Sequence, residues 1–353
     1  MKILPLVFAL FVSCLLCSGG TAVSSYLKKD DQWFAGKEAE VIFGTILSYQ
    51  AETGGWPKNT NTTKEPFDGK KKDLQATFDN GATTDELRFL ARIFGATGNE
   101  VARNAFEKGL DYILEAQYPN GGWPQFSPPG TKYHRHITFN DGSMVRIMEF
   151  LREVASDSRY EFVPKVEREA SMKAFDLGLE CLLKCQIVVN GRRTVWCAQH
   201  DEIDFQPRPA RVYELVSLSG SESVGIVRLL MSLENPSPEV REAIEGAVAW
   251  FDSARIKGIR IEKVKDARAP KGTNKVVVAD TRAKDLWARF YDIKTNEPIF
   301  CDRDGVAKKA LKDIGFERRN GYSWYGTWAE NLLEQQYPKW RAKLAAGAQS
   351  PGK

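Results

Sequence analysis

Two similar stretches, Phe78-Asp79-Asn80-Gly81 and Phe139-Asn140-Asp141-Gly142, decide how this chain folds. Each comes after a Gly-Gly-Trp-Pro turn and opens a helical pattern of apolar residues. The two stretches therefore place carboxylates at equivalent helix starts. Arginines follow further along the chain, at positions 211, 289 and 303. This combination indicates a site that holds a cation together with an acidic substrate, such as an acidic polysaccharide.

A third unit extends the pattern, because Trp56, Trp123 and Trp196 mark three comparable turns. The segments predicted to be helical are 35–49, 100–117 and 171–186 before the turns, and 85–94, 144–154 and 223–232 after them. Repeated helical hairpins must each bury one face against a neighbour. We therefore expect a mainly α fold in which three hairpins close into an (α/α)3 toroid, with the inner helices starting at a cleft. The tryptophans are interpreted mostly as packing residues of the turns.

The last third of the chain repeats less clearly. Residues 259–264 and 274–278 are rich in β-branched residues and are typical of short strands. We expect them to form a small, irregular and partly β flank of the toroid. No Ser-, Pro- or Gly-rich linker divides the chain, so residues 23–345 are predicted to be one catalytic domain, followed by a disordered tail at 346–353.

The first 22 residues are typical of a secretory signal peptide. Met1-Lys2 precedes an apolar run from Ile3 to Cys17, and small residues lead to Ala22, after which cleavage is expected. Leu15-Leu16-Cys17 resembles a lipoprotein signal, but the bulky Leu16 disfavours an anchor at Cys17. We therefore expect an exported protein, periplasmic or extracellular, with no integral membrane span.

The net charge and the cysteine content limit the functions and the disulfides that we expect. The formal net charge of +4 is too mild for a nucleic-acid binder, so any recognition of anions must be local. Four cysteines outside the predicted signal allow one or two disulfides in an oxidising compartment. Cys181 and Cys185 share a helix face, which makes pairing with each other awkward and favours pairing across to Cys197; Cys301 is the fourth. A zinc site has no CxxC pair to support it.

Structural explanations exist for each candidate residue taken alone. An aspartate before Asn-Gly or Asp-Gly at a helix start is often only a cap or turn residue. An isolated arginine such as Arg211 is more often a surface or ion-paired residue. His134 and His136 suggest a metal pair, but the sequence shows no third ligand near them.

The order of motifs along the chain indicates a specific family of proteins. The chain resembles the pectate lyases of polysaccharide lyase family 10, through blocks that follow the family order and cover nearly all of the predicted mature chain. These blocks are GGWPK (54–58), FDNGAT (78–83), FNDGSM (139–144), VWCAQHD (195–201), ARVYE (210–214), LSGSES (218–223), LWARFY (286–291), IFCDRDG (299–305) and RRNGYSWYG (318–326).

This resemblance implies a secreted, calcium-dependent enzyme that cleaves de-esterified homogalacturonan (polygalacturonate) by β-elimination, leaving 4,5-unsaturated oligogalacturonides. It implies that Asp79 and Asp141 bind Ca2+ and that Arg211 removes the C5 proton. Three further residues are implied to bind substrate: Arg289, Arg303 and Asn80. The enzyme is expected to act as a monomer.

The role implied for Arg211 carries a chemical difficulty. The pKa of a free arginine lies above about 12, so the side chain is a poor base unless its surroundings disfavour the cation. Calcium, neighbouring arginines and desolvation are expected to do this.

Two other classes of protein remain open at this point: a glycoside hydrolase on a related toroid, which needs two carboxylates flanking the scissile bond, and a non-catalytic protein that binds acidic polysaccharides.

Overall fold

The structure is a computed structural model, of which residues 21–348 are described. The first twenty residues of the predicted signal peptide and the last five of the predicted tail lie outside this range. Within it, no helix is both long enough and apolar enough to cross a membrane.

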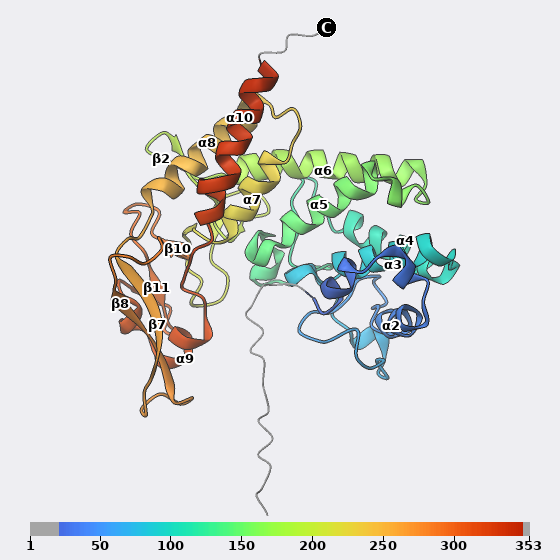
Figure 1. The fold of residues 1–353 in the computed structure, drawn as a ribbon, viewed down its shortest axis with the longest axis horizontal. Coiled ribbons are helices and arrows are strands. Elements are labelled where there is room, and N and C mark those ends of the chain that lie inside the picture. Colours follow the sequence, from blue (N-terminus) through green and yellow to red (C-terminus); the bar gives the residue numbers. More distant parts are fainter. Residues whose placement is uncertain (1–20, 349–353) are drawn as a thin grey trace, which may run out of the picture.

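Three helical hairpins form the body of the molecule, as the sequence predicted. Their helices are α2 (Lys37–Ser48) with α3 (Thr84–Thr97), α4 (Glu100–Glu115) with α5 (Ser143–Ser156), and α6 (Lys165–Cys185) with α7 (Glu222–Met231). Helices α3, α5 and α7 contact one another in that order and form the inner layer, while α4 packs against α6 outside them. Figure 1 shows α5 and α6 lying side by side above α3 and α4. The mainly helical toroid is confirmed.

Shorter and later helices complete this body. Near the start of the described chain, η1 (Val23–Lys28) and α1 (Asp31–Phe34) pack on α3. The sequence did not predict α8 (Pro238–Ser253), which packs on α7, or α10 (Tyr337–Ala348), which follows the π-helical turn Leu332–Gln336. Helix α10 includes residues 346–348, where we expected disorder. Because Ala345, Ala346 and Ala348 are strong helix formers, the helix continues through them.

The β-containing flank also matches the prediction. Strands β7 (Ile259–Lys265) and β8 (Thr273–Ala279) form an antiparallel hairpin that packs on α9 (Phe316–Gly321), on the opposite side of the molecule from α4 in Figure 1. Strand β10 pairs with β6 and so joins this flank to the start of α7. The two-residue strands are β1 Ile137–Thr138, β2 Val188–Val189, β3 Arg192–Arg193, β4 Gln199–His200, β5 Pro207–Arg208, β6 Leu218–Ser219, β9 Trp287–Ala288, β10 Phe290–Tyr291, β11 Phe300–Cys301, β12 Ala307–Lys308 and β13 Tyr325–Gly326.

One tryptophan is buried completely at each hairpin turn, which confirms that these residues serve packing. Each indole N–H donates to one of the last carbonyls of the preceding helix, a group that has no partner within the helix. The bonds run from Trp56 to Ile46 at 2.8 Å, from Trp123 to Ile113 at 2.9 Å and from Trp196 to Leu182 at 2.8 Å. Trp287 makes the same bond to Phe251 of α8, at 2.8 Å. The repeat therefore extends one turn beyond the three predicted units.

A glutamine next to each turn links one hairpin to the next. The side-chain amide of Gln50 donates to the Gly54 carbonyl of its own turn and to the Ala105 carbonyl of α4, both at 2.8 Å. Two later glutamines repeat this arrangement, Gln117 to Gly121 and Ala174, and Gln186 to Thr194 and Ala243. Each amide thus ties a turn to the next outer helix. We call this pair of bonds the glutamine bridge.

The turns need glycine where they meet these helices. Gly54 and Gly121 have φ values of 106° and 90°, which L side chains rarely adopt. A Cβ atom at Gly121 would lie 2.0 Å from the Leu177 carbonyl oxygen of α6. The backbone therefore approaches the outer helix as closely as the glutamine bridge requires.

Helix α3 begins at a capping box formed by Thr83 and Glu86. One carboxylate oxygen of Glu86 accepts from the Thr83 backbone N–H at 2.8 Å, and the other accepts from the Thr62 hydroxyl at 3.2 Å. Glu86 is completely buried. Burial, and to a smaller extent the neighbouring charge of Asp85, raises the pKa of Glu86 to about 8.

The first prediction concerns the glutamine bridge. Gln50→Ala leaves the buried carbonyls of Gly54 and Ala105 without these hydrogen bonds, so the free energy of unfolding should fall by about 1–3 kcal/mol. Urea denaturation followed by circular dichroism measures the change. Gln32→Ala, at an exposed position of α1, is the control and should leave the midpoint unchanged. Equal midpoints for both variants would show that the bridge contributes nothing to stability.

The second prediction concerns Glu86. Because its pKa is raised from 4.5 to about 8, the folded protein retains a proton that the unfolded chain loses, so this contribution to stability is present below pH 4.5 and disappears as the pH rises towards 8. Glu86→Gln cannot ionise and should therefore flatten the decline of unfolding free energy across that range. Urea titrations at several pH values test this, with Glu115→Gln on the exposed side of α4 as control. An unchanged pH dependence in Glu86→Gln would contradict the assignment.

Candidate active site

The two stretches that open the sequence analysis form short helical turns that contact each other, η3 (Asp79–Gly81) and η5 (Asn140–Gly142). Asn80 and Asp141 adopt left-handed conformations, with φ values of 57° and 50°. Asparagine and aspartate tolerate this region better than other L residues. The residue before each is buried, Asp79 in one turn and Asn140 in the other. The carboxylate therefore occupies the buried position in the first repeat and the left-handed position in the second.

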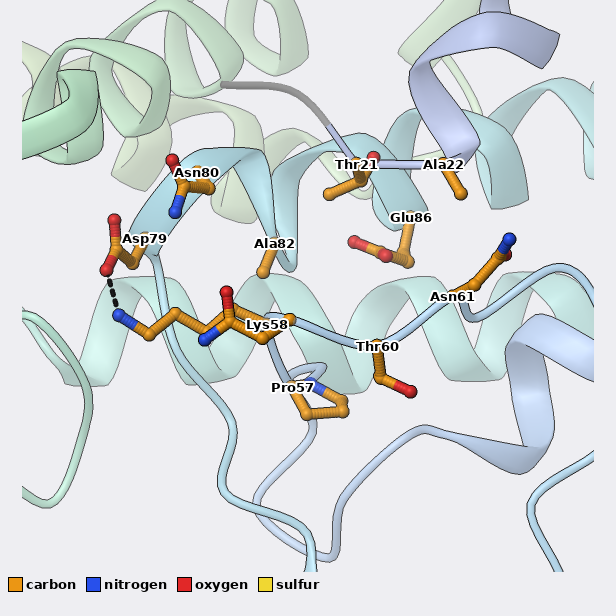
Figure 2. A pocket seen from close by; sticks show the side chains of 11 residues that line it. Thr21, Ala22, Pro57, Lys58, Thr60, Asn61, Asp79, Asn80, Ala82 and Glu86 are labelled. Atoms are coloured by element: carbon orange, nitrogen blue, oxygen red, sulfur yellow. Dashed lines mark hydrogen bonds and ion pairs between the residues drawn. The ribbon is translucent and has the colours of Figure 1, made fainter. Parts of the chain in front are cut away.

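A cavity of about 160 Å³ opens between these turns. Four of the predicted site residues line it: Asp79, Asn80, Asp141 and Arg211. Lys58 and Glu214 contribute to the same wall. A neighbouring cavity of about 320 Å³ also includes Lys58, Asp79 and Asn80, and it extends to Thr21 and Glu86 (Figure 2). The site thus lies at the starts of the inner helices, as the sequence predicted.

Asp79 is held by two donors. The Lys58 ammonium forms an ion pair with its Oδ2 atom, drawn as the dashed line in Figure 2. The side-chain amide of Gln125 donates to the same oxygen at 2.7 Å. The other carboxylate oxygen, Oδ1, is buried and has no hydrogen-bond partner within residues 21–348. Asp79 therefore keeps one acceptor available although it is almost completely buried.

Asp141 is half-buried and is held by Arg289, which comes from the flank. The Arg289 Nη2 atom lies 3.1 Å from Asp141 Oδ1 and 2.6 Å from Glu222 Oε1, at the start of α7. Asn140 donates to the other oxygen of Asp141 at 2.8 Å. Burial raises the pKa of Glu222 to about 7, although Arg289 opposes this shift. The Arg289 guanidinium thus joins two inner helix starts, and its binding of substrate stays a prediction.

Arg211 is paired with Glu214, three residues later. Arg211 Nε donates to Glu214 Oε2 at 2.8 Å, and Nη2 donates to Oε1. The Tyr322 hydroxyl also donates to Oε1, at 2.7 Å. The bond to Glu214 raises the pKa of Arg211 above its ordinary value, even though burial opposes it. Our expectation that the surroundings disfavour the Arg211 cation is therefore wrong for this structure, because a nearly buried carboxylate stabilises that cation.

Like Arg289, Arg303 does not line the cavity wall. It is exposed, and its Nε and Nη2 atoms donate to Glu317 at 3.0 and 3.1 Å. Its guanidinium lies 5.9 Å from the ring centroid of Tyr213, against which Arg211 also packs at 5.0 Å. Arg303 and Arg211 therefore approach the same tyrosine ring, and contact of Arg303 with substrate remains a prediction.

The sequence reasoning missed several residues of the site. Lys58 and Gln125 had a signal, because each directly follows a Gly-Gly-Trp-Pro turn, and Glu214 stands three residues after Arg211. Glu222 and Tyr322 had no comparable signal, since only the fold brings them to their partners.

Two expectations about other clusters need revision. The four cysteines are free and buried, so the disulfides that the sequence allowed are not formed. Cys181 and Cys185 lie on one face of α6, and both are buried. His136 does have neighbouring ligand types, because its ring lies within 4.8 Å of carboxylate oxygens of Asp201 and Glu202. Those carboxylates are already paired with Arg208 and Arg135.

Comparisons with known proteins agree with this geometry. The sequence model of the pectic acid lyase family matches residues 50–333, which is more than half of the chain. The solved structure of family 10 polysaccharide lyase from Cellvibrio cellulosa is 33% identical, covers 92% of this chain and 98% of its own, and superposes with a TM-score of 0.78. A mutant of family 10 polysaccharide lyase from the same organism, in complex with trigalacturonic acid, is 33% identical over 90% of this chain and 97% of its own, with a TM-score of 0.77. The search of curated proteins gives no match. The chain therefore belongs to the pectic acid lyase family and is a pectate lyase of polysaccharide lyase family 10.

Proposed function

We propose that this pectate lyase cleaves polygalacturonate by calcium-assisted β-elimination in the cavity between η3 and η5, and that it does so as an exported protein. The observation that carries the proposal is that Asp79, Asp141 and Arg211 line one cavity although they come from distant parts of the chain. The complex of the related Cellvibrio enzyme with trigalacturonic acid supports a galacturonate substrate. The family assignment favours a lyase over the hydrolase and the non-catalytic binding protein.

The reaction removes the proton from C5 of a galacturonate unit and breaks the bond between C4 and O4. The electron pair of the C5–H bond forms the C4–C5 double bond, and O4 leaves with the electron pair of the C4–O4 bond and takes up a proton. The difficulty is electrostatic, because negative charge develops beside a carboxylate that is already charged. The site must therefore neutralise that carboxylate and stabilise the developing charge.

The residues present fit a calcium ion. Calcium prefers hard oxygen ligands, and carboxylates are the most common of these. Asp79 has a buried Oδ1 atom with no partner within the described chain, and Asp141 keeps about a third of its side chain exposed at the cavity. A calcium ion held by Asp79 and Asp141 would neutralise the substrate carboxylate and stabilise the charge that develops in the transition state. Asn80, on the same wall, is placed to bind the sugar.

Arg211 is the proposed proton acceptor, and Glu214 sets its orientation. The two bonds to Glu214 hold the guanidinium in one plane at the cavity wall. They also favour the cation, so Arg211 must lose a proton before it can accept one from C5. Only a small deprotonated fraction exists near neutral pH, and this fraction grows with alkalinity. The reaction should therefore become faster as the pH rises.

The third prediction concerns the product. The exported enzyme should form ultraviolet-absorbing unsaturated uronides from polygalacturonate, and a chelator should abolish this activity because Asp79 and Asp141 then lack their cation. Ultraviolet absorbance measures the double bond of the product. The intact mass of the secreted enzyme shows whether the signal peptide is removed after Ala22. Restoration by added calcium is the control. Full activity in excess chelator would exclude the calcium role, and reducing sugar without absorbance would indicate hydrolysis instead.

The fourth prediction concerns Arg211. Arg211→Ala should lower kcat by about 10²–10⁴-fold with a much smaller change in KM, because proton removal belongs to the transition state. Arg303→Ala, in the paired arginine beside the cavity, should instead mainly raise KM. Initial rates over a range of polygalacturonate concentrations separate the two effects. If Arg211→Ala keeps its turnover and loses only affinity, Arg211 binds substrate and another group accepts the proton.

A further inference from the structure

Lys58 holds an unusual position for a residue outside the predicted site. It directly follows the first Gly-Gly-Trp-Pro turn, and it lines both cavities of the site. Figure 2 shows its side chain extended along the wall until the ammonium meets Asp79. One third of the Lys58 side chain is exposed, whereas only 3% of the Asp79 side chain is. The ion pair thus joins a solvent-accessible cation to a buried carboxylate.

Lys58 is the cation that contacts the carboxylate of Asp79. A buried carboxylate without a compensating cation is costly. Gln125, the other group that donates to Asp79, is neutral. Both Lys58 and Gln125 bind the same oxygen, Oδ2, and leave Oδ1 without a partner. The ammonium therefore provides the compensating charge while half of the carboxylate stays available.

This arrangement conflicts with a second cation at the same carboxylate. A divalent ion bound to Asp79 would lie within a few ångströms of the Lys58 ammonium, and two positive charges at such a distance repel strongly in a partly buried site. The two cations therefore compete for the carboxylate, although they can bind different oxygens of it. Because Lys58 is partly exposed on a long side chain, it is the partner able to move.

We propose that Lys58 competes with calcium for Asp79, and that a uronate carboxylate of the substrate receives the displaced ammonium. The inference rests on the calcium role proposed for Asp79. The larger cavity offers room for this exchange, since its lining beyond Lys58 includes the neutral polar residues Asn59, Thr60 and Asn61. The polyuronate brings a negative charge on every sugar, so it can pair with the ammonium that the metal displaces. Calcium and substrate therefore strengthen each other's binding through Lys58.

The fifth prediction tests this exchange by calorimetric titration of the full-length enzyme with calcium. Arg211→Ala serves as the parent, so that trigalacturonate is not consumed during the titration. Adding Lys58→Met should lower the calcium Kd by about tenfold or more without substrate, because the competing cation is gone. Trigalacturonate should tighten calcium binding in the parent and have much less effect in the Lys58→Met protein.

Three further variants make the result decisive. Lys284→Met removes a lysine that pairs with Glu330 on the surface, so it changes the net charge equally and should bind calcium like the parent. Lys58→Arg keeps the charge and should also resemble the parent. Lys58→Gln removes the charge but keeps a donor for Asp79, and it replaces the methionine variant if circular dichroism shows that the latter is unfolded.

The outcomes separate this inference from the proposed function. If the neutral variants at position 58 bind calcium no more tightly than the parent, Lys58 does not compete, and the calcium role stands. A gain of the same size in Lys58→Arg or Lys284→Met would also overturn the competition, because the effect would not come from the charge at this position. If no protein binds calcium even with trigalacturonate, the calcium role fails and the inference fails with it.

Discussion

The glutamine bridge is the interaction on which the rest of this structure depends. At each hairpin turn one side-chain amide reaches both its own turn and the next outer helix, with bonds of 2.8 to 3.0 Å. The buried tryptophan of the turn ties it to the helix before it. Because both bonds recur with the same geometry, successive hairpins stack in one register, and the inner helices α3, α5 and α7 start close together. The active site is a consequence of this alignment, since its carboxylates lie at those starts.

Each hairpin brings a carboxylate to the site, and each of these carboxylates contacts a basic side chain. Asp79 pairs with Lys58, whereas Asp141 and Glu222 share Arg289. Arg211 and Glu214 form a further pair nearby. This internal balance stabilises a strongly charged and largely buried cluster, because each of its four carboxylates lies against a cation. Under the proposed function, calcium and uronate would exchange partners with the protein when they bind. The contacts that stabilise the site would then reduce its affinity for either ligand.

The helices were predictable because their signals are local. Apolar residues recur at helical spacing from Leu87 to Ile93 and from Val145 to Leu151, and the structure buries them on the inner face of α3 and α5. Helix α8 was not predicted although its apolar residues have a similar spacing, because no Gly-Gly-Trp-Pro turn lies next to it in the sequence. Trp287, which makes the same bond as the other turn tryptophans, comes from a strand. The fourth repeat is therefore visible only as a tertiary contact.

By itself, the sequence determined the repeated hairpins, the two helix starts and the residue types Asp79, Asn80, Asp141 and Arg211, because these depend on spacing and on motifs within a few residues. Tertiary structure alone decided which cation compensates each carboxylate. Arg289 reaches Asp141 across 148 residues of sequence, and Tyr322 reaches Glu214 across 108. Such pairings follow from the stacking of the hairpins and from burial, which makes an unpaired charge costly. The pair of Arg211 and Glu214 is the exception, because Glu214 lies only three residues further along the chain.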